Sequence, residues 1–182
     1  MASTKLYTVE DLLEMEDDGC RHELMYGELI SIPPTNDEHS GLAFRLSGLL
    51  WVYHQAHPEI RWFSGDPGFL LTRDPDLLLA PDLAAVHAEH LPADFPRRLF
   101  FDVVPDLAIE ILSPSERLGQ ITDKVNAYLD VGVQMIWLVN PAHRSVTVHS
   151  PDQHTRILEG DDILDGGEVL LEFRLPLADL FT

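Results

Sequence analysis

Hydrophobic and polar residues repeat with two different periods along this chain, and the longer period predicts helices. In segment 39–55 apolar residues recur every three or four positions, as on the buried face of a helix: Leu42, Leu46, Leu49, Leu50 and Tyr53. Segment 117–131 repeats the pattern, and Gly132 supplies the residue that commonly ends a helix. The sequence therefore predicts two long amphipathic helices, over 39–55 and 117–131.

Short apolar segments separated by Gly, Pro and Asn predict strands. They lie at 61–63, 68–72, 82–86, 107–112, 133–139 and 145–149, and segments 21–26 and 28–32 form a hairpin around Gly27. A short helix over 9–15 is capped by Thr8 with Asp11 three residues later, and a last helical turn is expected at 176–180. This order predicts one α/β (α+β) domain over residues 1–182, with a mixed β-sheet core flanked by helices.

Charge narrows the classes of partner. The 182 residues include 12 basic and 31 acidic side chains, which gives a net charge of −19. Such a field repels phosphate backbones and excludes indiscriminate coating of nucleic acid, whereas carboxylate clusters suit hard divalent cations. Cys20 is the sole cysteine, and the sequence contains neither a secretory signal pattern nor an apolar run long enough to span a membrane. We therefore expect a cytoplasmic protein without a membrane partner.

Glu110 is the most informative acidic residue. It lies within Leu107–Leu112, an otherwise apolar run that predicts a strand covered on both faces. An unpaired carboxylate costs several kcal/mol in such a place, so Glu110 must be paired, protonated or bound to a cation. A structural ion pair with an arginine and a functional role are equally compatible with this position.

Asp82 is the best partner for Glu110 as a metal ligand. It enters the predicted strand 82–86, where it is either a turn residue or, beside Glu110, half of a two-carboxylate site for Mg²⁺ or Mn²⁺. Asp106 is a weaker partner. It shares a strand face with Glu110 but lies roughly 13 Å away, too far to share one ion.

Lysine is scarce, since only Lys5 and Lys124 occur. On a helix over 117–131, Lys124 lies about 90° from the centre of the apolar face, on the flank that Arg117 shares. From there its stem can extend along the sheet toward Glu110 while the ammonium stays in water. The alternative is an ordinary solvated lysine.

Five ordered blocks of the sequence resemble the Uma-two family of restriction-endonuclease-like proteins, within the PD-(D/E)XK nuclease superfamily. They are residues 21–30 with the following proline pair and His39, Ala80-Pro81-Asp82-Leu83-Ala84, residues 105–115, Asp123-Lys124 with Tyr128, and residues 132–141. The resemblance extends from about Tyr7 to Leu180 and implies a restriction-endonuclease-like fold.

The resemblance also implies roles for particular residues. Asp82 matches the aspartate of the superfamily motif and Glu110 its second acid, whereas Leu112 stands where the motif has its lysine. The resemblance places that lysine at Lys124 and suggests Glu23 as a further acid and His39 as a substrate contact. The implied activity is Mg²⁺- or Mn²⁺-dependent cleavage of DNA phosphodiester bonds. Asp82, Glu110 and the Ile111 carbonyl would hold the ion, and Lys124 would position water or stabilise charge.

Two hypotheses from different classes remain at this stage. The first is a metal-dependent endonuclease that acts as a homodimer, because cleavage of both strands of a duplex needs two sites. The second is a catalytically silent nuclease-fold module that binds or regulates a partner, which the negative charge and Leu112 favour. Zinc hydrolysis by His54 and His57 or by His87 and His90 lacks the required motif. Finally, Trp51, Trp62 and Trp137 are expected in the core.

Overall fold

The computed structural model describes residues 5–92, 100–113, 117–152 and 155–182. Its helices are α1 (Val9–Glu14), α2 (Asp37–His54), the 3₁₀ turn η1 (Ala88–His90), α3 (Leu118–Asp130) and α4 (Leu177–Leu180). Its strands are β1 (Arg21–Met25), β2 (Glu28–Ile32), β3 (Ile60–Ser64), β4 (Gly68–Thr72), β5 (Leu77–Leu79), β6 (Leu83–His87), β7 (Phe100–Phe101), β8 (Leu107–Ile111), β9 (Met135–Asn140), β10 (Ser145–His149), β11 (Arg156–Glu159), β12 (Ile163–Gly166) and β13 (Leu170–Pro176).

The strands form three sheets in the described part of the chain. A six-stranded sheet has the order β11-β10-β9-β8-β6-β3, and a five-stranded sheet has the order β2-β1-β5-β4-β7. Strands β12 and β13 form a separate pair. The six-stranded sheet is mixed, because β8 and β9 run parallel on either side of the α3 crossover while β6 and β8 run antiparallel. The predicted mixed sheet flanked by helices is confirmed.

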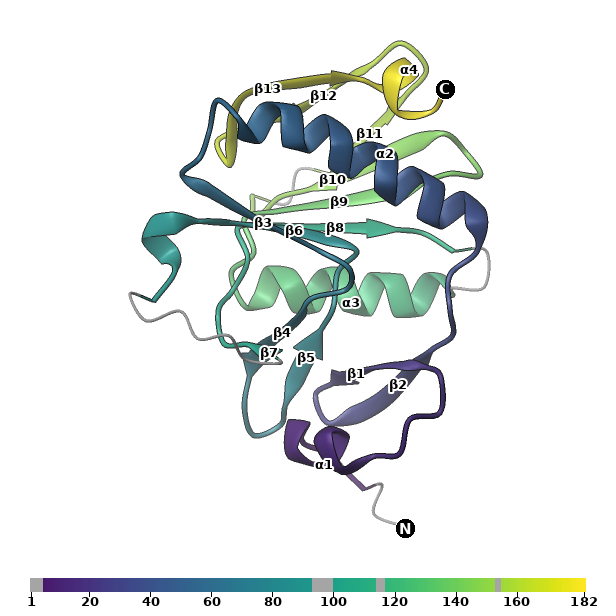
Figure 1. Ribbon diagram of the computed structural model, residues 1–182, viewed down its shortest axis with the longest axis vertical. Coiled ribbons are helices and arrows are strands. Elements are labelled where there is room, and N and C mark those ends of the chain that lie inside the picture. The colour runs from purple at the N-terminus through teal and green to yellow at the C-terminus, as the bar shows by residue number, and fades with distance from the viewer. Residues whose placement is uncertain (1–4, 93–99, 114–116, 153–154) are drawn as a thin grey trace.

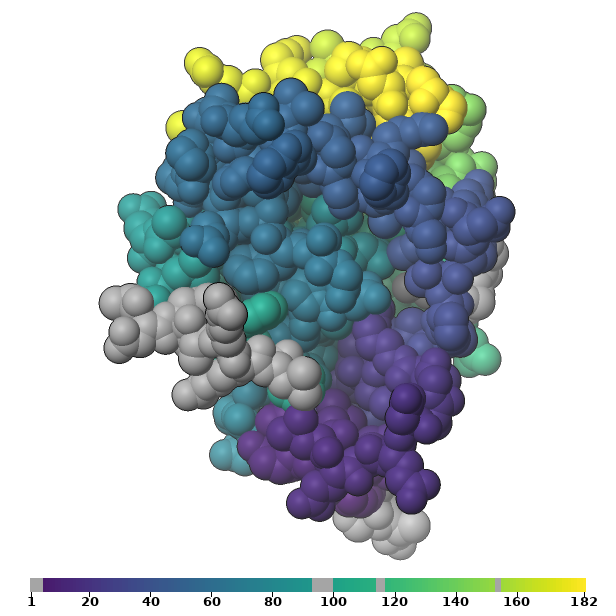
Figure 2. Space-filling view, in the orientation of Figure 1, coloured from purple at the N-terminus to yellow at the C-terminus, as the bar shows by residue number. Residues whose placement is uncertain are grey.

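The six-stranded sheet lies at the centre of the molecule, with helices on both faces (Figure 1). On one face α2, β13 and α4 bury a core with Leu46, Ile109 and Trp137. On the other face α3 packs with β5 through Val125, Tyr128 and Leu77. The space-filling view shows the C-terminal segment beside α2 at one end and the N-terminal segment at the other (Figure 2).

Most predicted elements are present, with ends shifted by one or two residues. The hairpin is formed by β1 and β2, and Gly27 adopts a positive φ of 84° at its turn, a conformation that favours glycine. Thr8 and Asp11 form the predicted capping box. Gly132 follows α3 with a φ of 100° and thereby ends the helix.

Three details differ from the expectation. Asp82 lies just before β6 instead of within a strand. The apolar pattern of segment 117–131 includes Leu118, but this residue is exposed at the start of α3 and does not belong to its buried face. Trp51 is also exposed, on the outer face of α2, because Leu42, Leu46 and Leu50 occupy the face toward the sheet. Trp137 is fully buried, as expected.

No helix within the described ranges is both long and apolar enough to cross a membrane.

Candidate active site

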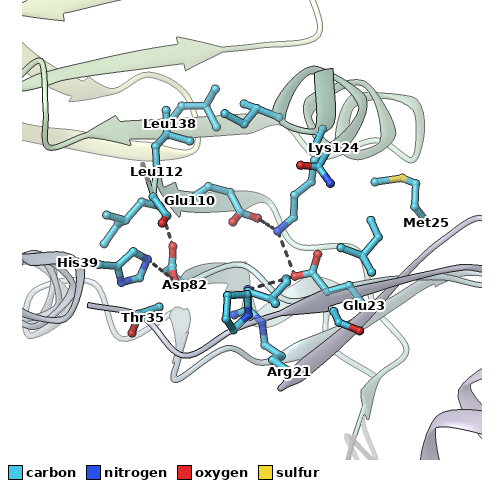
Figure 3. Close-up of a pocket in the computed structure, with 18 of the residues that line it drawn as sticks. Arg21, Glu23, Met25, Thr35, His39, Asp82, Glu110, Leu112, Lys124 and Leu138 are labelled. Carbon is cyan, nitrogen blue, oxygen red and sulfur yellow. Dashed lines mark hydrogen bonds and ion pairs between the residues drawn. The ribbon is translucent and has the colours of Figure 1, made fainter. Parts of the chain in front are cut away.

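A cavity of about 240 Å³ lies where the β1–β2 hairpin, the start of α2, the end of β8 and helix α3 meet. The four residues that the sequence singles out for catalysis all line it: Glu23, Asp82, Glu110 and Lys124. They come from β1, the residue before β6, β8 and α3, so distant parts of the chain contribute one polar side chain each (Figure 3). The acids are nearly buried, with Glu23 1%, Asp82 8% and Glu110 7% exposed.

Lys124 joins two of these acids. Its Nζ lies 2.9 Å from Oε1 of Glu110 and 3.1 Å from Oε1 of Glu23, and Figure 3 shows it pointing between them. Burial alone lowers the pKa of an ammonium, but the charges of Glu110 and Glu23 outweigh this effect and raise the pKa of Lys124 above its ordinary value. Lys124 is therefore protonated at neutral pH.

This geometry corrects one expectation. The side chain of Lys124 is only 13% exposed, so its ammonium is enclosed by two carboxylates and does not stay in water. The helical pattern gave its direction on α3, but it could not show that the β1–β2 hairpin covers that flank. Arg117, expected on the same flank, lies exposed just before α3 and is absent from the cavity lining.

Tyr128 provides a further contact to Glu110. Its hydroxyl donates a hydrogen bond of 2.7 Å to Oε1 of Glu110, the atom that also faces Lys124. Burial raises the pKa of Glu110 to about 7; Lys124 opposes this rise, whereas the carboxylates of Glu23 and Asp82 add to it. Glu110 can therefore hold or release a proton near neutral pH.

Asp82 is held from two sides. Its Oδ2 accepts a hydrogen bond of 2.6 Å from the backbone N–H of Ile111, and its Oδ1 lies 3.1 Å from Nε2 of His39. His39 lies in the first turn of α2 and is 8% exposed, so the helix directs its ring at Asp82. The Ile111 side chain packs in the core on the face toward α2, which leaves its backbone to line the cavity.

Arg21 was not among the predicted site residues, yet it lines the cavity. Its guanidinium lies 3.4 Å from Glu23 and 2.5 Å from Asp66, and its buried Nε has no hydrogen-bond partner among the described residues. An oxygen-rich ligand in the cavity would satisfy this donor. One signal was available: Arg21 and Glu23 are two positions apart on one strand, and such residues share a face.

Asp106 and the histidine pairs lie outside the cavity. Asp106 accepts a hydrogen bond from the His87 backbone and contacts the His90 ring, so it anchors η1. The Nε2 of His87 lies 2.8 Å from the Val169 carbonyl oxygen. The rejection of Asp106 as a partner for Glu110 therefore agrees with the geometry. Of the Ser113-Pro114-Ser115 block, only Ser113 lies within the described residues, and it lines the cavity.

The donor set fits a hard divalent cation, although the described residues contain no group of three or more His, Cys, Asp or Glu side chains arranged around one ion. Two carboxylates, Asp82 and Glu110, and the backbone at Ile111 offer oxygen atoms to one cavity. Mg²⁺ characteristically takes few protein oxygens and keeps several waters. Burial raises the pKa of Glu110 and the carboxylates of Glu23 and Asp82 add to the rise, whereas a bound cation would favour the charged carboxylate.

Comparisons with known proteins agree with this architecture. Residues 9–178 match the family Uma2, described as "Putative restriction endonuclease". A crystal structure from Anabaena variabilis, titled as "a putative nuclease belonging to DUF820", is similar over 96% of this chain and 97% of its own, with a TM-score of 0.83 and 24% identity. At that identity the likeness establishes the fold alone. No curated protein matches.

Proposed function

Because this chain belongs to the Uma2 family of restriction-endonuclease-like proteins, we propose that it is a metal-dependent nuclease that hydrolyses phosphodiester bonds of DNA. The observation that carries the proposal is the buried cluster of Asp82, Glu110 and Lys124 in one cavity. Two acids and a cation around one cavity form a set suited to holding a divalent ion beside a phosphate.

In this proposal Asp82, Glu110 and the Ile111 carbonyl would hold Mg²⁺ or Mn²⁺. The bound ion would stabilise negative charge on the phosphate and acidify a water molecule. His39 and the Ile111 N–H keep the Asp82 carboxylate in one orientation, and Tyr128 does the same for Glu110. This preorganisation removes the cost of orienting the acids during the reaction.

Lys124 positions the attacking water through its Nζ and stabilises the charge that develops on the phosphate. Glu23 pairs with this ammonium and keeps it beside the Glu110 carboxylate. The water oxygen bonds to phosphorus and the bond to the leaving sugar oxygen breaks. The water loses one proton and the leaving oxygen gains one, so the number of protons does not change in the step.

The position of the lysine on α3 is the unusual element of the proposal. In the superfamily motif that the sequence resembles, the lysine lies two residues after the acid, and Leu112 stands there in this chain. Lys124 reaches Glu110 from the neighbouring helix instead. Replacement of Lys124 by Ala should abolish cleavage of labelled DNA while Mg²⁺ still raises the melting temperature, because the two proposed metal-binding acids remain.

The same experiment separates the enzyme from a silent nuclease-fold module. A silent module predicts no cleavage in Mg²⁺ or Mn²⁺ by the wild type and no rise in melting temperature with either ion. Cleavage that persists at the wild-type rate in Lys124→Ala would assign the role of the cation to another residue, with Arg21, which also lines the cavity, as the candidate.

We also propose that the protein acts as a homodimer. Helix α2 presents an apolar outer face with Phe44 80%, Trp51 59% and Val52 68% exposed. A two-fold dimer that pairs this face with its copy would bury the three side chains, and burial of aromatic residues is typical of such interfaces.

A further inference from the structure

The reacting groups of the proposed nuclease lie at the bottom of a cavity, not on an open surface. Glu23, Asp82 and Glu110 are each less than 9% exposed, and the side chain of Lys124 is 13% exposed. The cavity measures about 240 Å³, slightly below the ~300–1,000 Å³ of sites for small ligands. A phosphate must enter this cavity to reach Lys124, and no length of continuous duplex fits within that volume.

The lining of the cavity combines charged and apolar groups. Beside the acids, Lys124 and Arg21, it includes apolar side chains of the β1–β2 hairpin, the loop after it, α3 and β9: Met25, Ile30, Ile32, Pro33, Ile121 and Leu138. Apolar side chains beside charged groups match one nucleotide, whose base and sugar present apolar faces and whose phosphate is anionic.

The charge of the chain points in the same direction. A protein that contacts about 6–10 phosphates of a duplex neutralises them with Lys and Arg side chains. This chain has 12 basic residues in all and a net charge of −19. In the cavity, Lys124 and Arg21 are already paired with carboxylates, so the site can recruit charge for one phosphate but not for a row of them.

We propose that the cavity binds a single unpaired nucleotide, so that the substrate is a single-stranded segment, a strand end or a nucleotide displaced from a helix, and not continuous duplex DNA. The cleavage that this inference predicts rests on the proposed function, whereas the binding of the nucleotide does not depend on it. A paired nucleotide would have to leave its helix first, which costs a few kcal/mol, whereas an unpaired nucleotide enters without that cost.

The first measurement is cleavage of four labelled DNA substrates of the same sequence in Mn²⁺. These are a single strand, a blunt duplex, a duplex with one bulged nucleotide and a duplex with a single-stranded tail. The inference predicts that the duplex with a single-stranded tail is cut beside its unpaired nucleotides. It also predicts that the blunt duplex is cut at about one tenth of the rate of the single strand or more slowly. Equal cleavage within the blunt duplex would overturn it.

The second measurement is binding, which separates this inference from the proposed activity. The fluorescence anisotropy of a labelled single-stranded tetranucleotide is titrated with protein in Ca²⁺. Ile32→Trp should fill the cavity from β2 and weaken binding by about tenfold, and Ile121→Trp should do the same from α3. Ile157→Trp is the matched control, because Ile157 is 67% exposed on β11 and outside the cavity; its affinity should equal that of the wild type.

The outcomes are distinguishable. Binding lost in both cavity variants but not in the control, without cleavage of any substrate, supports the nucleotide cavity and contradicts the proposed function. Binding of the blunt duplex as tight as that of the single strand, or single-strand binding that neither cavity variant weakens, overturns the inference whatever the cleavage result. The melting temperature of each variant shows whether it has folded. If one cavity variant has failed to fold, the other cavity variant decides the test.

Discussion

Replacement of Lys124 by Met tests the buried ion-pair cluster. The change removes the ammonium that lies 2.9 Å from Glu110 and 3.1 Å from Glu23, and it leaves two buried carboxylates facing each other. Removal of one partner from a buried ion pair costs about 3–5 kcal/mol. Because ~1 kcal/mol shifts the melting temperature of a domain of this size by ~2–4 °C, we expect a decrease of about 10 °C near pH 8.

The loss should depend on pH. Without Lys124 the pKa of Glu110 rises further, so the folded variant binds a proton that the unfolded chain releases above about 4.5. The free energy of unfolding of the variant therefore falls as the pH rises, and its deficit relative to the wild type is larger at pH 8 than at pH 5. Urea denaturation of both proteins at the two pH values measures this difference.

Two further variants make the test specific. Lys5→Met removes the only other lysine, whose pair with Asp11 is exposed, and should leave the stability unchanged. Lys124→Met combined with Glu110→Gln removes one of the two facing charges and should recover more than half of the loss. A Lys124→Met protein that loses less than about 1 kcal/mol, or loses the same amount at both pH values, would refute the reasoning.

Three other predictions concern the titration of Glu110, the position of the lysine and the dimer. In the wild type the pKa of Glu110 is raised to about 7 from an ordinary 4.5, so the free energy of unfolding should fall by up to about 3 kcal/mol as the pH rises between these values. Urea titrations of Glu110→Gln should show a flatter dependence on pH. Equal slopes for the two proteins would contradict the prediction. Leu112→Lys combined with Lys124→Ala should recover part of the cleavage that Lys124→Ala loses, since Leu112 lines the same cavity; a double variant as inactive as the single one would count against it. Light scattering should give twice the 20.5 kDa monomer mass for the wild type and the monomer mass for Trp51→Glu, and a monomeric wild type would exclude the dimer.

The fold was predictable where the hydrophobic period was strong. The helices α2 and α3 and the strand β8 follow directly from their apolar residues, because burial of one face determines each of them. The strands β11, β12 and β13 were also missed: β11 is mostly exposed, β12 is only four residues long, and the burial of β13 departs from strict alternation. The strands β5 and β7 were missed because they are only three and two residues long.

The site was predictable as a set of residues but not as a set of contacts. A carboxylate in an apolar strand identified Glu110. Their positions at the start of a predicted strand and on the flank of a predicted helix singled out Asp82 and Lys124, and the resemblance assigned roles to both. The sequence could not show that His39 meets Asp82, because α2 and the residue before β6 are brought together only by the tertiary fold. For the same reason it placed the Lys124 ammonium in water, whereas Glu23 on the hairpin encloses it.

The contact between Tyr128 and Glu110 was predictable from the spacing of Lys124 and Tyr128 on a helix. Tyr128 lies four residues after Lys124, and such positions share one face of a helix. A helix that directs Lys124 toward Glu110 therefore brings the Tyr128 hydroxyl to the same carboxylate, as the bond of 2.7 Å shows. The apolar pattern of segment 117–131 includes Tyr128 and the resemblance adds no role for it, whereas in the structure its ring is part of the core and its hydroxyl reaches Glu110.

The most direct test of the central claim is a titration of DNA cleavage with Mg²⁺ and Mn²⁺ for the wild type and Asp82→Asn. The asparagine oxygen can still accept from the Ile111 N–H and its amide can donate to His39, so the fold of the cavity is kept while one ionic ligand is lost. We predict cleavage that rises with the concentration of either ion in the wild type and is absent in Asp82→Asn at equal melting temperature. Cleavage by Asp82→Asn with the wild-type dependence on metal, or cleavage by the wild type in excess chelator, would contradict the account.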